Sequence, residues 1–140
     1  MKAPRYIPKA VVLMFQEDLI RRYGGSPGLR DEGLLDSALA RPQARFGNKE
    51  LHSSLFTKAA AYCYHLCLNH PFVDGNKRLA LVVTDTFLQM NGYELTASEE
   101  EAFRAISDVA AGRITKEQLT QWVERHSKRL RPSEPGILEK

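Results

Sequence analysis

The segment LFTKAAAYCYHLCLNH, residues 55–70, constrains the fold more than any other part of the sequence. On a helix its apolar residues cover nearly every side, and such a helix must be surrounded by other elements. Ser53 or Ser54 lies just before it and is a suitable N-terminal cap. The chain has 140 residues, of which 43% are hydrophobic, and this is enough for one core. The segment therefore predicts a central, buried helix in a single all-α domain.

Elsewhere apolar residues recur at helical spacing, and no stretch keeps the alternation of a long strand. A first helix is predicted from about Lys9 to Tyr23, ended by Gly24-Gly25. Its inward-facing residues are predicted to be Val12, Phe15, Leu19 and Ile20. The turn formers of SPGLRDEG, residues 26–33, predict a loop or small hairpin. Asp31 would cap a second helix, which ends before Pro42.

In the second half of the chain, KRLALVVTDTFLQM (residues 77–90) predicts a helix that closes at Asn91-Gly92. Two capping boxes open further helices, Ser98 with Glu101 and Thr115 with Gln118. The last helix is expected to bury Leu119, Trp122 and Val123. RPSEPGILEK, residues 131–140, is expected to be a flexible tail after a domain spanning residues 1–130. The prediction is one bundle of about six helices with a short hairpin or loop.

Composition and charge exclude several function classes. The formal charge of +3 and the pI near 8.9 are mild, and a nucleic-acid surface would need a denser basic stripe. No apolar run approaches the roughly 20 residues that span a bilayer. The apolar start of the chain soon gives way to Gln16, Glu17 and Asp18, so we do not interpret it as a signal peptide. We therefore expect a cytoplasmic protein with no membrane partner and no direct nucleic-acid binding.

The loop HPFVDGNKRLA, residues 70–80, joins two predicted buried helices and opens the second of them. The first turn of a helix has unpaired backbone N–H groups and the positive end of the helix dipole. Gly75 allows a tight turn and the close approach of a ligand. Asn76 adds an amide, and Lys77 and Arg78 add two cations. These residues predict an anion site suited to a polyphosphate.

Other side chains of this loop are suited to group transfer to a hydroxyl. Asp74 precedes the anion site, and a carboxylate beside phosphates is a usual Mg²⁺ ligand. His70 can accept the proton of an attacking hydroxyl, and Phe72 is expected to point into the core and anchor the loop. Alone, His70 or Asp74 would more simply cap a helix, and Lys77-Arg78 would be a solvated face. Their combination favours a nucleotide-dependent transferase.

A metal site is the alternative reading of Cys63, Cys67 and His70, which could share one face of the central helix. Zinc needs a fourth ligand or a water, and the sequence has no third cysteine to complete a typical set. Buried, reduced cysteines that pack as small apolar residues are the favoured interpretation.

At residues 70–80 the sequence resembles the Fic/Doc family, whose signature is a His, a Phe two residues later, an acidic residue, Gly-Asn and Arg. HPFVDGNKRLA is similar to the Doc (death-on-curing) branch, the toxins of bacterial toxin–antitoxin pairs. The segments RYGGSPGLRDEGLLDSALARPQARFG (22–47), NGYELTASEEEAF (91–103) and AAGRIT (110–115) also resemble that branch. The resemblance covers roughly residues 6–126 and implies a Fic/Doc-like helical bundle with a short flap.

The resemblance also implies the role of each residue. His70 would be the general base and Asp74 the Mg²⁺ ligand, with ATP as the co-substrate. Gly75 and Asn76 would form the anion hole, and Arg78 would pair with a terminal phosphate. Family members carry a target-docking flap, which binds by strand addition, at the position of Ser26, Pro27, Gly28, Leu29 and Arg30.

Lys77 departs from the wider family, because Fic AMP-transferases resemble a pattern with a second Gly at this position. In the Doc branch the Lys form is associated with reversed ATP, so that the γ-phosphoryl group faces the acceptor. Lys77 is therefore also a candidate catalytic residue. The resemblance implies a protein Ser/Thr kinase, whose target in Doc is a threonine of elongation factor Tu, so that translation stops. An AMP- or other nucleotide-transferase and a non-catalytic regulatory module remain open as alternatives.

Many Fic proteins carry an inhibitory helix marked by Ser or Thr, three further residues, Glu, and then Gly or Asn. No segment of this sequence matches it, because Gly28 stands at the Ser/Thr position before Glu32-Gly33, and Thr96 with Glu100 is followed by Glu101. Inhibition of the activity is therefore expected to come from a separate, Phd-like antitoxin.

Overall fold

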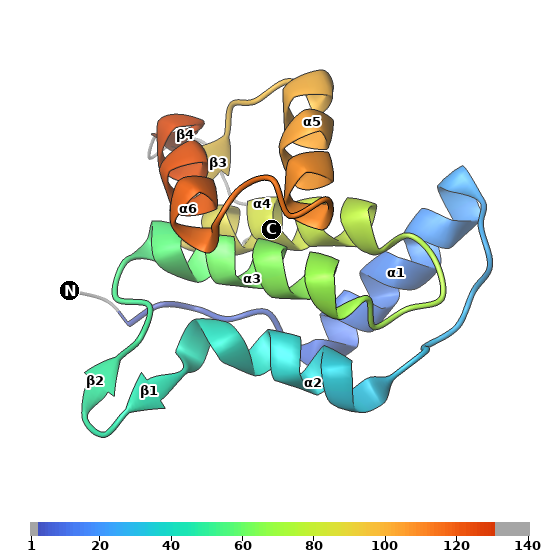
Figure 1. Ribbon diagram of the computed structural model, residues 1–140, viewed down its shortest axis with the longest axis horizontal. Helices are drawn as coiled ribbons and strands as arrows, with labels where there is room; N and C mark the ends of the chain where they lie inside the picture. The colour runs from blue at the N-terminus through green and yellow to red at the C-terminus, as the bar shows by residue number, and fades with distance from the viewer. Residues whose placement is uncertain (1–2, 131–140) are drawn as a thin grey trace.

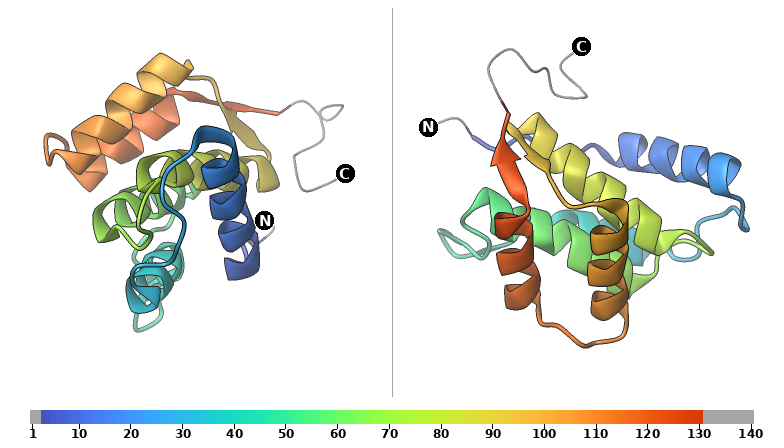
Figure 2. Two further views of the ribbon diagram at one scale, coloured as in Figure 1. Left: turned by 90° about the vertical axis from the view of Figure 1, so that its right-hand side faces the viewer. Right: turned by 90° about the horizontal axis from the view of Figure 1, so that it is seen from above.

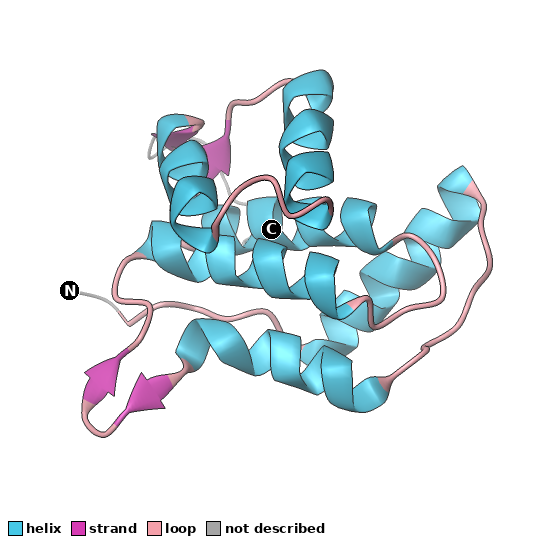
Figure 3. Ribbon diagram, in the orientation of Figure 1, coloured by secondary structure: helices cyan, strands magenta, loops and turns pink. Residues whose placement is uncertain are grey.

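The computed structural model describes residues 3–130 as six α-helices, one short 3₁₀-helix and two small antiparallel sheets (Figure 3). The α-helices are α1 (Lys9–Tyr23), α2 (Glu32–Ala40), α3 (Leu55–Asn69), α4 (Asn76–Met90), α5 (Glu99–Ala110) and α6 (Lys116–Arg125). The shorter elements are η1 (Arg41–Gln43), β1 (Arg45–Phe46), β2 (Lys49–Glu50), β3 (Tyr93–Leu95) and β4 (Ser127–Arg129). The predicted class and helix number are confirmed. The predicted tail lies outside the described residues. Within the described part, no helix is both long and apolar enough to cross a membrane.

Helix α3 lies at the centre of the bundle, as its apolar sequence predicts (Figure 1). Helix α4 runs beside it, α5 and α6 cover one side of this pair, α2 packs on the other side of α3, and α1 packs on α4 (Figure 2). Tyr62 of α3 is fully buried against Phe87 of α4, with ring centroids 5.0 Å apart. Burial of each such side chain stabilises the fold by about 1.5–3 kcal/mol. The α3–α4 pair is therefore a firm support for the loop that joins its two helices.

Four helices begin at their predicted caps, where a side-chain oxygen accepts an N–H group of the first turn. The capping residues are Asp31, Ser54, Ser98 and Thr115. The predicted end of α4 is also confirmed, because Gly92 follows it with a φ of 89°. These boundaries depend on local chemistry, which the sequence displays directly.

Some residues predicted to face inward do not do so fully. In α1, Phe15 and Ile20 are only partly buried, whereas Gln16 is buried. The reason is that the Gln16 amide bonds to the α3–α4 loop, which turns a polar residue towards the interior. In α6, Trp122 is only partly buried because it lines a surface groove between α5 and α6, where its indole stacks on His126 with ring centroids 4.4 Å apart.

The small sheets were not predicted. Strand β1 pairs with β2, with Arg45 opposite Glu50, and β3 pairs with β4, with Leu95 opposite Ser127. In segment 26–33, for which a loop or small hairpin was predicted, residues 26–31 are a loop with one isolated β-bridge and residues 32–33 already belong to α2. Strands of two or three residues are too short to show an alternation in the sequence.

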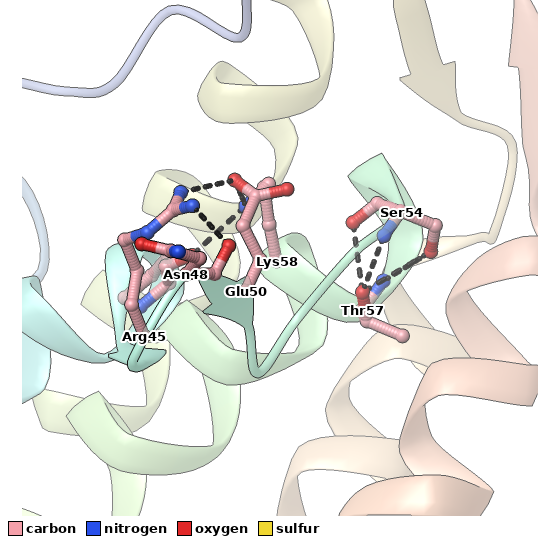
Figure 4. Close-up of polar contacts among 7 residues, drawn as sticks. Arg45, Asn48, Glu50, Ser54, Thr57 and Lys58 are labelled. Carbon is pink, nitrogen blue, oxygen red and sulfur yellow. Dashed lines mark hydrogen bonds and ion pairs between the residues drawn. The ribbon is translucent and has the colours of Figure 1, made fainter.

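Lys58 of α3 is a buried charge, only 1% exposed. Its ammonium lies 3.1 Å from Glu50 Oε1 and donates to the Pro42 carbonyl at 3.2 Å (Figure 4). Within the same hairpin, Arg45 donates to the Asn48 carbonyl at 2.6 Å. Because a buried charge is costly without partners, these contacts hold η1 and the β1–β2 hairpin against α3.

Candidate active site

The loop between α3 and α4 lies beside the segment that joins α1 to α2 (Figure 1). It begins at His70, which ends α3 in a left-handed conformation with φ 50° and ψ 55°. The Arg30 side chain donates to the carbonyl groups of His70 at 2.7 Å and Asn69 at 3.0 Å. These carbonyls have no partner within the helix, so Arg30 caps the C-terminus of α3. The backbone of His70 is thus held, while the residue itself is exposed.

Phe72 and Asn76 hold the middle of the loop. Phe72 is 3% exposed and belongs to the core, so it anchors the loop there. The Asn76 side chain is 5% exposed; its Nδ2 donates to the Phe72 carbonyl at 2.9 Å, and its Oδ1 accepts the Phe72 N–H at 3.0 Å. The Asn76 amide, which we predicted to bind an anion, therefore shapes the loop. The backbone N–H groups of the first turn of α4 remain for an anion.

The N-terminus of α4 begins after Gly75, which has a φ of 78° and provides no side-chain cap. A positive φ of this size favours glycine. A Cβ at Gly75 would lie 3.4 Å from Gln16 Nε2 and 3.5 Å from Ile20 Cδ1, so the turn packs directly on α1. Lys77 and Arg78 follow in the first turn, and both are exposed. The unpaired N–H groups and two cations therefore meet at one accessible helix end.

Gln16 of α1 packs against this turn and holds it by a hydrogen bond. It is 4% exposed, and its Nε2 donates to the Asp74 carbonyl at 2.7 Å. Its Oε1 is buried and has no hydrogen-bond partner among the residues that the structure describes. We did not predict this role, because Gln16 stands with Glu17 and Asp18 in a polar stretch of α1. Nothing local reveals a bond that spans 58 positions of the chain.

Asp74 joins the loop to the segment after α1. Its Oδ2 accepts the Ser26 N–H and its Oδ1 accepts the Gly75 N–H, both at 3.2 Å. The residue is exposed, so its carboxylate keeps lone pairs that a cation can reach. Mg²⁺ takes one or two carboxylates together with phosphate oxygens and water. A single exposed carboxylate beside an anion-binding helix end fits that donor set.

The predicted flap, residues 26–30, lies against the loop. An isolated antiparallel bridge pairs Leu29 with Phe72. The bridge is formed by the Val73 N–H, which donates to the Gly28 carbonyl at 3.0 Å, and the Arg30 N–H, which donates to the Pro71 carbonyl at 2.8 Å. One backbone edge of the flap is therefore occupied by the loop. Pro27, Gly28 and Leu29 also line a groove of about 470 Å³ against α1.

Both predicted phosphate-binding cations lie over exposed aromatic rings. The Lys77 Nζ is 6.0 Å from the centroid of the Phe103 ring, and the Arg78 Cζ is 4.0 Å from the centroid of the Tyr23 ring. Tyr23 is 56% exposed and Phe103 is 55% exposed. Neither ring was predicted to belong to the site, because Tyr23 lies in α1 and Phe103 in α5, far from the loop in the sequence.

Cys63 and Cys67 are free and buried within α3, in line with the favoured interpretation. Burial raises the pKa of the Cys63 thiol to about 12, and burial also raises the pKa of the Cys67 thiol. Both groups stay protonated at neutral pH and pack as small apolar residues.

Comparison with known proteins agrees with this geometry. The model of the Fic/DOC family matches residues 6–88, which include the flap and the whole loop. A protein named Toxin Doc, from Mycolicibacterium smegmatis, is 48% identical over 75 residues, which cover 54% of this chain. That match spans only 58% of the length of the mycobacterial protein. A protein named Protein kinase doc, from Escherichia phage P1, is 34% identical over 113 residues, which are 81% of this chain and 85% of the phage protein. The chain therefore belongs to the Fic/Doc family, and within it to the Doc branch.

Proposed function

We propose that this protein is a kinase toxin, which transfers the γ-phosphoryl group of ATP to a Ser or Thr hydroxyl of a target protein. One observation carries the proposal. The exposed residues His70 and Asp74 precede, and the exposed cations Lys77 and Arg78 follow, a helix N-terminus that has no side-chain cap. The name of the phage relative, Protein kinase doc, supports the choice of phosphoryl transfer.

The first turn of α4 would bind the phosphates. Its backbone N–H groups and the helix dipole favour negative charge, and Gly75 leaves no side chain in the way. Lys77 and Arg78 would stabilise the charge that develops on the transferring group and on the leaving β-phosphate. Asp74 would hold Mg²⁺, which neutralises phosphate oxygens when it is bound.

His70 would act as the general base. It accepts the proton of the target hydroxyl as the oxygen forms a bond to the γ-phosphorus. The bond between that phosphorus and the β-phosphate oxygen breaks, ADP leaves, and His70 later releases the proton to solvent. Arg30 contributes indirectly, because its bonds to the His70 and Asn69 carbonyls fix the chain that carries the imidazole. Positioning of this kind is a large part of phosphoryl-transfer catalysis.

The target would dock beside the flap, at the backbone edge that faces away from Phe72. By resemblance to the Doc branch, the target is elongation factor Tu and the result is a block of translation. On the same resemblance, we propose that a separate, Phd-like antitoxin inhibits the activity in the cytoplasm.

The test is incubation of the protein with purified elongation factor Tu, or with a cell extract, and ATP labelled at either the γ or the α position. We expect transfer of the γ label only, and its loss in His70→Asn. Transfer of the α label would instead assign AMP transfer. Binding of ATP without transfer of either label would show that the protein is a non-catalytic regulatory module.

A further inference from the structure

Arg78 is the cation of the loop with the closest aromatic contact. Its guanidinium lies 4.0 Å from the Tyr23 ring centroid, whereas Lys77 lies 6.0 Å from the Phe103 centroid. A guanidinium over an aromatic face at this distance makes a favourable cation–π contact. Arg78 is an exposed residue with a long side chain, which would otherwise sample many rotamers. The ring of Tyr23 therefore selects one orientation of the guanidinium.

The position of Tyr23 is itself fixed relative to the loop. Tyr23 is the last residue of α1, and the Gly24 N–H that follows it donates to the Ile20 carbonyl at 2.8 Å. Two residues further on, the Ser26 N–H donates to the Asp74 carboxylate. The turn after α1 thus fastens the backbone next to Tyr23 to the same loop that carries Arg78. From this backbone the ring contacts Arg78, in the first turn of α4, from outside that helix.

We infer that Tyr23 is a positioning residue for Arg78 and prepares this guanidinium to bind a polyphosphate at the N-terminus of α4. The inference rests on the proposed function for the identity of the ligand as ATP. It adds a role for a side chain of α1, which touches neither the phosphates nor the acceptor hydroxyl in this scheme.

The test is a double-mutant cycle of Tyr23→Leu and Arg78→Ala. The affinities for inorganic tripolyphosphate and for Mg²⁺–ATP are measured by calorimetry, and γ-phosphoryl transfer is measured in parallel. A cation–π contact at an exposed site corresponds to about a two- to fivefold change in affinity. We expect Tyr23→Leu to weaken binding by about this factor, and Tyr23→Phe, which keeps the ring, to bind like the parent. In the Arg78→Ala background, Tyr23→Leu should have no further effect.

Phe46→Leu is the matched control, since Phe46 is an exposed aromatic residue on the β1–β2 hairpin, away from α4. It should bind both ligands like the parent. Parental binding by Tyr23→Leu, or an equal loss with and without Arg78, would overturn the inference. If the parent binds tripolyphosphate but transfers no label, the proposed kinase function fails, while the binding cycle still decides the role of Tyr23.

Discussion

Gly24 and Gly25 provide a stringent test of the link between the turn after α1 and the predicted metal ligand. Both have a positive φ, 83° and 107° respectively. A Cβ at Gly24 would meet no atom of residues 3–130 within 4 Å. A Cβ at Gly25 would lie 2.9 Å from Asp74 Oδ2 and 3.2 Å from Asp74 Cγ. Alanine at either position strains the backbone, but only alanine at Gly25 collides with the carboxylate.

The expected losses in the free energy of unfolding follow from this backbone strain and this collision. Gly24 has φ 83° and ψ −174°, a region that is essentially restricted to glycine. A side chain held there costs about 1–3 kcal/mol, so Gly24→Ala should lower the free energy of unfolding by that amount. Gly25→Ala carries a similar backbone cost and must also move the Asp74 side chain, because a contact of 2.9 Å is too close for a Cβ. That movement breaks the hydrogen bond from the Ser26 N–H, which adds about 1 kcal/mol. We therefore expect a loss of about 2–4 kcal/mol in the free energy of unfolding for Gly25→Ala.

The decisive measurement is the binding of ATP with and without Mg²⁺, by calorimetry, at a temperature where urea unfolding shows both variants to be folded. Gly24→Ala should keep the parental gain in affinity from Mg²⁺. Gly25→Ala should lose most of that gain, and adding Asp74→Asn to it should change little more. If Gly25→Ala and Gly24→Ala show the same Mg²⁺ dependence, Asp74 does not need this turn, or does not hold the metal.

Three further changes test other parts of the site and the fold. His70→Asn keeps a residue that tolerates a positive φ but removes the base, so the rate of γ-phosphoryl transfer should fall at least about a hundredfold with little change in melting temperature; an unchanged rate would remove His70 from the mechanism. Lys77→Gly removes a cation and should cost about 1 kcal/mol of helix stability. Its γ-phosphoryl transfer should collapse, and full retention of that transfer would show that Lys77 does not set the chemistry. Burial first, then the charges of Lys116 and Arg41, lower the pKa of His65 from 6.5 to about 4. The unfolded chain therefore binds a proton more readily between these values, so the free energy of unfolding should decrease as the pH falls from 6.5 towards 4. Because His65 is only partly buried, we expect a discounted loss of about 1–2 kcal/mol; urea midpoints that change equally with pH in His65→Gln would exclude this source.

The features that could be predicted from the sequence are local ones. The capping residues Asp31, Ser54, Ser98 and Thr115 act on N–H groups within three positions, so a short stretch of sequence contains both partners. The loop at residues 70–78 is local in the same sense, since its candidate base, carboxylate and cations all lie within this one short stretch. The burial of α3 follows from its composition alone.

The features that could not be predicted depend on pairs that are distant in the sequence. The bond from Gln16 to the Asp74 carbonyl spans 58 positions, and the bond from Arg30 to the His70 carbonyl spans 40. We assigned Arg30 to a flap that binds a target, yet its guanidinium faces α3. A polar residue on an amphipathic helix and an arginine in a turn are ordinary surface residues until the fold supplies a partner. Tyr23 is also an ordinary surface residue in the sequence, and only the fold brings its ring to Arg78.

The dipeptide His70-Pro71 shows how local and distant constraints combine at the site. Proline disfavours the helical conformation of the residue before it, so α3 must end at His70. The chain leaves the helix through a left-handed residue, which costs about 1–3 kcal/mol for a side chain other than glycine. The carbonyls of His70 and Asn69 are then left without helical partners, and Arg30 supplies both hydrogen bonds. Arg30 also donates its backbone N–H to the Pro71 carbonyl. Arg30, which satisfies the carbonyls at the end of α3, therefore also joins the flap to the loop. The backbone that carries the imidazole is therefore tied to the flap edge, so the candidate base and the surface that a target would approach are joined by the same hydrogen bonds.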